Sequence, residues 1–276
     1  MLQYLKKRTL AYLLPWIVWT FAIRGLILDE NSFFKLRFLL WHMDSGYWFL
    51  ISLWTIVTIF GFAIYLSTCF QSKSLYVHIS AVVLFCILGM TGLAAIGYAA
   101  GFSFLCIKLT LFYFPFFLAG YIFGQIQGKL TTHIGNWANW IGIASLVIWL
   151  TIMIRFNFYK NDMTLGLVVL RYVSSLFGSL AVIVIVNQYV KRSIGISDLK
   201  MKGALLKILN WIGVHSLAVY ILHGFSLNMI RLSVLPDYYE GITIIALNYT
   251  ICILATVFLI KVIQLNPVLN KILFWK

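Results

Sequence analysis

Negative charge is scarce in this sequence. Seven of its 276 residues are acidic and 10% are charged, whereas about a quarter of the residues of an ordinary soluble domain carry charge. Apolar residues make up 62% of the chain and aromatic residues 17%. A water-soluble fold of this length cannot bury that much apolar surface. The composition therefore excludes a soluble enzyme and a disordered chain, and it predicts a polytopic membrane protein.

Cysteine is also sparse, and none of the four cysteines has the CxxC or CxxH spacing of a metal site or a disulfide framework. The sequence also lacks the Walker, Rossmann, HExxH and GxSxG patterns. We therefore expect neither a bound metal nor the cofactor chemistry of soluble enzymes. The formal net charge of +14 does not indicate nucleic-acid binding, because membrane proteins retain lysine and arginine in their cytoplasmic loops.

Long continuous apolar runs are abundant. About twenty apolar residues cross a bilayer as a helix, and continuous runs exclude a β-barrel, whose strands alternate. The sequence therefore predicts an all-α bundle of about eight transmembrane helices. The predicted spans lie near residues 10–28, 46–70, 75–100, 104–127, 137–156, 165–190, 208–230 and 241–265.

Lysine and arginine gather in alternate loops, namely the amino-terminal segment, the loops after the second, fourth and sixth runs, and the segment after the eighth. Six of the seven acidic residues lie in the opposite set of loops. This bias places both termini in the cytoplasm, in agreement with an even number of spans. No repeat or linker interrupts the chain, so we expect one membrane domain over residues 1–276.

Several ionisable side chains fall inside the predicted spans, where charge is costly and usually faces the bundle interior or water. Arg24, Lys108, Arg171 and His223 lie at one level, toward the acidic outer loops. They predict a polar cavity for a ligand that arrives from outside. In this cavity Arg24 and Lys108 would contact the ligand. The alternative is that the cations extend to the outer headgroups.

His42 and Asp44 lie in the first predicted outer loop. An imidazole two residues from a carboxylate can act as a general base with its orienting partner. His42 is therefore a candidate base, and a pair of solvated loop residues is the alternative interpretation of His42 and Asp44.

Two glycine motifs predict close approach between helices. They are Gly97-xxx-Gly101 and Gly120-xxx-Gly124, and the small side chains of such motifs let two membrane helices pack backbone to backbone.

Four segments together carry a resemblance. They are KKRTLAYLLPWIVW at 6–19, SGYWFLISLW at 45–54, LFYFPFFLAGYIFG at 111–124 and LNWIGVHSLAVYILHGF at 209–225. In order and spacing they resemble segments of the membrane-bound acyltransferase 3 family: a basic-then-Pro entry to a span, a Trp-Phe-Leu segment, a Phe-Phe-x-x-Gly-Tyr span and a late Ser-Leu-x-x-Tyr-x-x-His span.

The resemblance implies a membrane O-acyltransferase, typically an O-acetyltransferase, that moves an acyl group from acetyl-CoA to a hydroxyl of a cell-surface polysaccharide or lipid-linked glycan. It implies substrate contacts for Trp48 and Tyr220. For acyl transfer it implies that His223 or His42 is the base and that Arg171 or Lys108 stabilises the oxyanion. The basic residues at the donor's entrance are then Lys6, Lys7 and Arg8. The expected setting is a bacterial inner membrane, with the lipid bilayer, the glycan acceptor and other polysaccharide-biosynthesis proteins as partners.

Members of this family usually begin with two further spans, the first of which carries an Arg-to-His motif with the expected catalytic base. The sequence before residue 6 has no counterpart of these spans, so we expect an amino-terminally short member of the family. The alternatives are a truncated, inactive acyltransferase and a non-catalytic membrane protein, either a transporter of glycans or lipid-linked sugars or a scaffold.

Overall fold

The computed structural model describes residues 2–27, 43, 47–70, 74–134, 137–156, 165–194, 200–233 and 242–274. Within these ranges the chain is built from helices joined by short turns, and they contain no strand. The predicted all-α class is therefore confirmed for the part of the chain that the structure describes.

The chain folds into two compact units, residues 1–118 with 214–276 and residues 119–213. The helices of the first unit are α1 (Leu2–Ile17), the π-helix η1 (Val18–Ile27), α3 (Trp48–Ser67), η3 (Thr68–Phe70), α4 (Leu75–Ala100), η4 (Phe104–Cys106), α9 (Ser216–Ser233), α10 (Ile242–Gln264) and α11 (Pro267–Phe274). Those of the second are α6 (Ala138–Arg155), α7 (Leu165–Ile194) and α8 (Lys200–Val214), while α5 (Ile107–Ile134) runs from the first unit into the second. The single domain expected from the sequence stays a prediction.

Five helices in the described ranges are long and apolar enough to cross a bilayer. They are Trp48–Ser67, Leu75–Ala100, Phe104–Ile126, Gly166–Asn187 and Leu247–Gln264, and they match five of the predicted spans. These helices confirm the polytopic membrane class.

The other three predicted spans take different forms. The run at 208–230 is a bent pair, in which Lys207–Val214 and Ser216–Ser226 meet at 81°. The run at 137–156 is a shorter apolar helix, Asn139–Arg155, and the first run is helical as α1 and η1. The total of eight spans and the orientation of the termini stay predictions.

In the first unit, α1 packs against α3 in the antiparallel sense. The indole Nε1 of Trp54 donates a hydrogen bond to Thr9 Oγ1 at 3.1 Å. Farther along α3, the side chains of Leu5 and Tyr4 lie 3.3 and 3.6 Å from the position that a Cβ on Gly61 would occupy. The start of α1 therefore lies beside Gly61 in the second half of α3, and Thr9 lies beside Trp54 in the first half.

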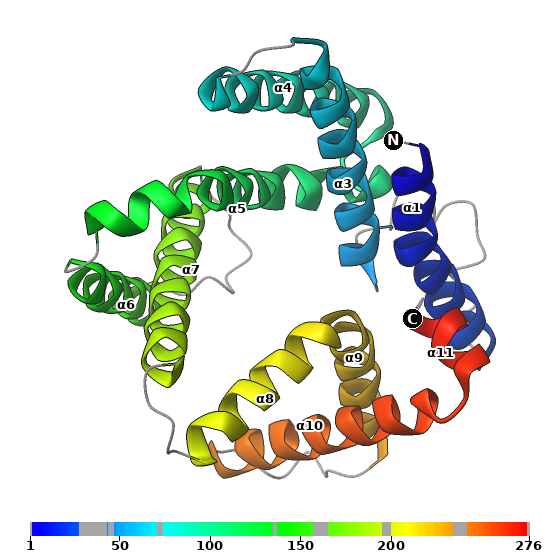
Figure 1. The fold of residues 1–276 in the computed structure, drawn as a ribbon. Helices are drawn as coiled ribbons and strands as arrows, with labels where there is room; N and C mark the ends of the chain where they lie inside the picture. The colour runs from blue at the N-terminus through cyan, green and yellow to red at the C-terminus, as the bar shows by residue number, and fades with distance from the viewer. Residues whose placement is uncertain are drawn as a thin grey trace. The chain divides into compact units, whose positions relative to one another are not determined.

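The carboxyl-terminal helix α11 lies beside α1, although the two are far apart in sequence (Figure 1). The contact centres on Trp19, which is only 3% exposed. Its Nε1 donates to the carbonyl oxygen of Leu273 at 3.2 Å, and its ring stacks on Phe274 with a centroid separation of 6.5 Å. Trp19 also meets the edges of Tyr47 and Phe225, at 5.9 and 5.8 Å. This aromatic core joins η1, the segment before α3, α9 and α11.

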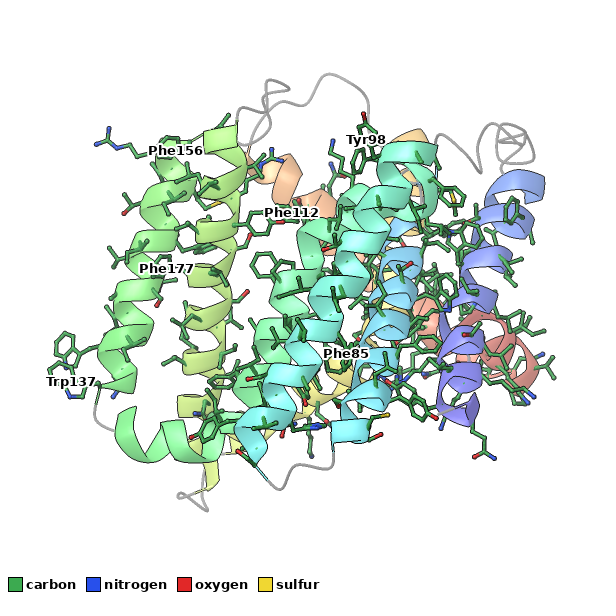
Figure 2. All side chains as sticks on the ribbon, turned by 90° about the horizontal axis from the view of Figure 1, so that it is seen from above. Phe85, Tyr98, Phe112, Trp137, Phe156 and Phe177 are labelled. Carbon is green, nitrogen blue, oxygen red and sulfur yellow. The ribbon has the colours of Figure 1, made fainter. Side chains whose placement is uncertain are left out.

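In the second unit, α6 and α7 run side by side, and Trp137 and Phe156 mark the two ends of α6 (Figure 2). The two helices approach closely because glycines face large side chains. A Cβ on Gly142 would lie 2.6 Å from Val184 Cγ1, and one on Gly178 would lie 3.0 Å from the indole of Trp149. The apolar outer faces of both helices are exposed, as lipid-facing surfaces are.

A tight turn joins α4 to α5. Gly101 ends α4 with φ 96°, and Leu105 and Cys106 have φ 48° and 53°. Left-handed backbone is costly for residues with a Cβ, so surrounding contacts must hold this turn. Two of them come from Met43: Leu105 N–H donates to its Sδ at 3.3 Å, and the Cys106 thiol donates to its carbonyl oxygen at 2.8 Å.

Candidate active site

Aromatic rings from α3, α5 and α9 meet at the amino-terminal end of α3. Trp48, the first residue of α3, stacks on Tyr113 of α5 with centroids 5.6 Å apart and planes 19° apart. Phe49 packs against Tyr220 of α9 at 4.9 Å. Leu50 and Ile51, the next two residues, are buried. Burial of these two residues fixes the first turn of α3 and holds Trp48 and Phe49 against the neighbouring helices.

The hydroxyl of Tyr220 caps α3. The first N–H groups of a helix have no partner within the helix, and Tyr47, at the N-cap position, makes no side-chain cap. The backbone N–H of Phe49 donates instead to the Tyr220 hydroxyl oxygen at 3.4 Å. A residue 171 positions away in the sequence thus supplies the cap that is usually local.

His223 lies one turn beyond Tyr220 on α9, with ring centroids 5.8 Å apart. Its Nδ1 lies 3.1 Å from the carbonyl oxygen of Val219. Because a carbonyl only accepts, the neutral ring carries its proton on Nδ1 and leaves the lone pair on Nε2. The His223 side chain is exposed, and its backbone carbonyl accepts from the Cys252 thiol of α10 at 3.5 Å. A reachable Nε2 of this kind can take a proton.

The basic triplet of α1 consists of Lys6, Lys7 and Arg8. All three side chains are exposed, and they fall between the contacts of Tyr4 and Thr9 with α3. The triplet therefore lies beside the middle of α3, about 14 Å along the axis from either end of that helix at 1.5 Å per residue. The Arg8 guanidinium lies 5.3 Å from the centroid of the Tyr4 ring and 3.4 Å from the Tyr12 hydroxyl.

The structure brings together three of the residues predicted for the site. Trp48, Tyr220 and His223 form a continuous series with Phe49, all within the first unit. Lys108 belongs to the same unit, is exposed near the start of α5, and donates its backbone N–H to Phe102 O at 3.0 Å.

The other predicted residues lie elsewhere or outside the description. Arg171 is half-buried on α7 in the second unit, whereas His223 belongs to the first; its role in the site stays a prediction. His42 lies outside the described residues, and so does the side chain of Arg24. The buried residue next to His42, Met43, is held by the turn that precedes α5.

The cluster of rings at the start of α3 consists of Trp48, Phe49, Tyr113, Tyr220 and His223. Two of them, Phe49 and Tyr113, were not among the predicted site residues. Both lie inside segments that carried the resemblance, but aromatic residues are so frequent in this chain that position alone did not distinguish them. Within the described ranges, no three His, Cys, Asp or Glu side chains come close enough to hold a metal ion. The cluster itself offers three groups: an imidazole that can act as a base, a phenol hydroxyl and an aromatic surface.

One of three comparisons with known proteins identifies a family. A sequence model of the acyltransferase 3 family, described as an acyltransferase domain, matches residues 1–263. None of the curated proteins matches the chain, and none of the solved structures does. The matched segment includes all the residues of the cluster. The chain belongs to the acyltransferase 3 family, and it is an integral membrane protein with the acyltransferase domain of that family.

Proposed function

We propose that the protein is an O-acetyltransferase of a bacterial inner membrane, which transfers an acetyl group from acetyl-CoA to a hydroxyl of a cell-surface polysaccharide or a lipid-linked glycan. The observation that carries this proposal is the pairing of Tyr220 with His223 beside the first turn of α3. Transfer of an acyl group requires a base for the acceptor hydroxyl, donors for the tetrahedral oxyanion, and sites for both substrates.

His223 acts as the general base in this proposal. Its Nδ1 donates to Val219 O, so Nε2 takes the proton of the acceptor hydroxyl as the oxygen attacks the thioester carbon. The same Nε2–H then returns the proton to the sulfur of CoA when the C–S bond breaks. His42 is the second candidate base, and Arg171 is a candidate for oxyanion stabilisation.

The acyl donor binds at Lys6, Lys7 and Arg8 in this proposal. The head group of CoA is a polyanion, and cationic side chains bind phosphate oxygens by charge-assisted hydrogen bonds. Exposed cations beside the middle of a membrane helix face water rather than lipid, because charge in hydrocarbon is costly. Their position beside α3 therefore supports a water-filled entrance that leads toward the start of that helix.

The acceptor binds at Trp48 and Tyr220, with Lys108 and Arg24 as further hydrogen-bond donors. The Trp48 ring is half-buried and lies flat against Tyr113. A rigid indole of this kind presents a large apolar face, which suits the C–H face of a sugar ring. The tryptophan would thus orient the sugar so that the reacting sugar hydroxyl points to His223.

The test uses purified full-length protein in proteoliposomes with [14C]acetyl-CoA and a panel of methyl pyranosides as acceptor probes. We expect His223→Gln to lower the rate of acetyl transfer by about 10²–10⁴-fold, which is the usual contribution of a positioned base. His215→Gln is the matched control, because it makes the same change just before α9 and outside the cluster. Its rate should equal that of the unmodified protein.

The outcomes separate the alternatives. Full activity in His223→Gln would remove His223 as the base and direct the same test to His42→Gln. No acetyl transfer by the unmodified protein, combined with movement of a labelled lipid-linked sugar across the proteoliposome membrane, would favour a transporter. Neither activity would favour a scaffold or an inactive member of the family.

A further inference from the structure

Among the described residues, the Tyr220 hydroxyl accepts a hydrogen bond but does not donate one. Its oxygen accepts from the Phe49 N–H, and among the described residues no acceptor takes its proton. A phenol carries one donor hydrogen in addition to its acceptor lone pairs. The cap on α3 therefore fixes the position of the oxygen and leaves the O–H free to donate.

We propose that Tyr220 is a catalytic residue, whose O–H donates a hydrogen bond to the thioester carbonyl oxygen as that oxygen becomes an oxyanion. This inference rests on the proposed acetyl transfer and adds a donor that is independent of any cation. Tyr220 and His223 lie three residues apart on one face of α9, with ring centroids 5.8 Å apart. One acyl group can therefore contact the phenol with its oxygen while the attacking hydroxyl contacts the imidazole.

The step balances without another reactant. The acceptor oxygen forms a bond to the carbonyl carbon, its proton passes to Nε2 of His223, and the carbonyl π electrons move to the oxygen that Tyr220 O–H contacts. The oxyanion then collapses, the C–S bond breaks, and the thiolate takes the proton from His223. Tyr220 keeps its own proton throughout, and the products are the acetyl ester and CoA.

The surroundings of Tyr220 suit such a donor. Donors that are fixed in advance stabilise a developing charge without reorganisation. The phenol oxygen is fixed at the first turn of α3, where the helix dipole places partial positive charge. The Phe49 ring packs against the Tyr220 ring with centroids 4.9 Å apart, and the Tyr220 side chain is half-buried. Partial removal from water strengthens a hydrogen bond to an oxyanion.

The main test compares Tyr220→Phe with Tyr249→Phe. The second variant removes a hydroxyl from an exposed side chain on α10, outside the cluster. Hydrolysis of acetyl-CoA without acceptor and transfer to the methyl pyranosides are both measured, because both pass through the same oxyanion. We expect Tyr220→Phe to lower kcat for both reactions by about 10²–10³-fold, as the loss of one oxyanion donor does, with KM for acetyl-CoA unchanged. Tyr249→Phe should keep the original kcat.

A second measurement separates catalysis from capping. With 3-fluorotyrosine at position 220, the phenol becomes a better donor and a poorer acceptor. An oxyanion donor then predicts a higher single-turnover rate, whereas a purely structural cap predicts a lower one. The proposal is overturned if Tyr220→Phe keeps the original kcat, or if 3-fluorotyrosine lowers the rate. A lack of acetyl transfer by the unmodified protein overturns the proposed function and this inference together, so the two failures are distinguishable.

Discussion

Replacement of Gly142 by alanine tests the packing of α6 against α7. The added Cβ would lie 2.6 Å from Val184 Cγ1 and 3.1 Å from Val184 Cβ. Carbon atoms pack at about 3.5–4.0 Å, so the helices must separate locally by about 1 Å. Val184 cannot turn aside easily, because a β-branched residue in a helix has one strongly favoured rotamer. We expect Gly142→Ala to lower the free energy of unfolding by about 1–3 kcal/mol.

The assay is reversible unfolding of the purified protein by SDS in mixed micelles, followed by tryptophan fluorescence. Gly124→Ala is the matched control, because a Cβ at Gly124 meets nothing within 4 Å in the described structure. Alanine has the higher helix propensity by about 1 kcal/mol, so this variant should be at least as stable as the original protein.

The double variant Gly142→Ala with Val184→Ala isolates the contact. Removal of both Val184 methyl groups takes away the closest atom, so we expect the double variant to recover about 1 kcal/mol relative to the sum of the two single changes. If Gly142→Ala unfolds at the same SDS concentration as Gly124→Ala, the close approach of these helices is refuted.

Three further changes test the first unit by the same unfolding assay. Thr110→Val should raise the free energy of unfolding by about 1 kcal/mol, because the buried Thr110 hydroxyl has no hydrogen-bond partner among the described residues; an unchanged or lower value would contradict this. Trp19→Phe should lower it by about 1–3 kcal/mol, since the carbonyl of Leu273 loses its donor, and full stability would show that this bond contributes nothing. Gly101→Ala should lower it by about 1–2 kcal/mol, because φ is 96° there, and an unchanged midpoint would refute the strain.

The sequence predicted the long membrane helices well. Apolar runs of about twenty residues have few stable alternatives in lipid, where backbone groups must be satisfied within the segment. The run at 208–230 was different, because the structure bends it by 81° around residue 215. Hydropathy measures how apolar a segment is and carries no information about its direction, so a bent pair and a straight span produce the same pattern.

Glycine motifs were a weaker guide to packing. Gly97 does pack closely, since a Cβ there would lie 2.9 Å from the Phe102 ring. For Gly120 and Gly124 close approach stays a prediction, since neither has a neighbour within 4 Å among the described residues. The close contact at Gly142 belongs to no such motif. Whether a glycine meets another helix depends on the partner's side chains, which spacing along one helix does not reveal.

The candidate site was predictable only in part. The three-residue spacing of Tyr220 and His223 places both on one face of a helix, and the structure confirms that their rings are neighbours. The contact of Tyr220 with Phe49 joins segments 171 residues apart, and no local pattern specifies such a pairing. Arg171 was grouped with His223 only because both are expected at the same depth in the membrane; the two belong to different units, so the grouping stays a prediction.

The hydrogen bond between Trp19 and Leu273 has a consequence for biosynthesis. Its two residues are separated by 254 positions, and a ribosome adds about 5–20 residues per second. The indole of a newly inserted chain therefore waits about 10–50 s for its acceptor, while neighbouring helices enter the membrane. Because α9 is made late in that interval and α11 only at its end, the indole N–H has to bond to water or to a lipid headgroup for most of it.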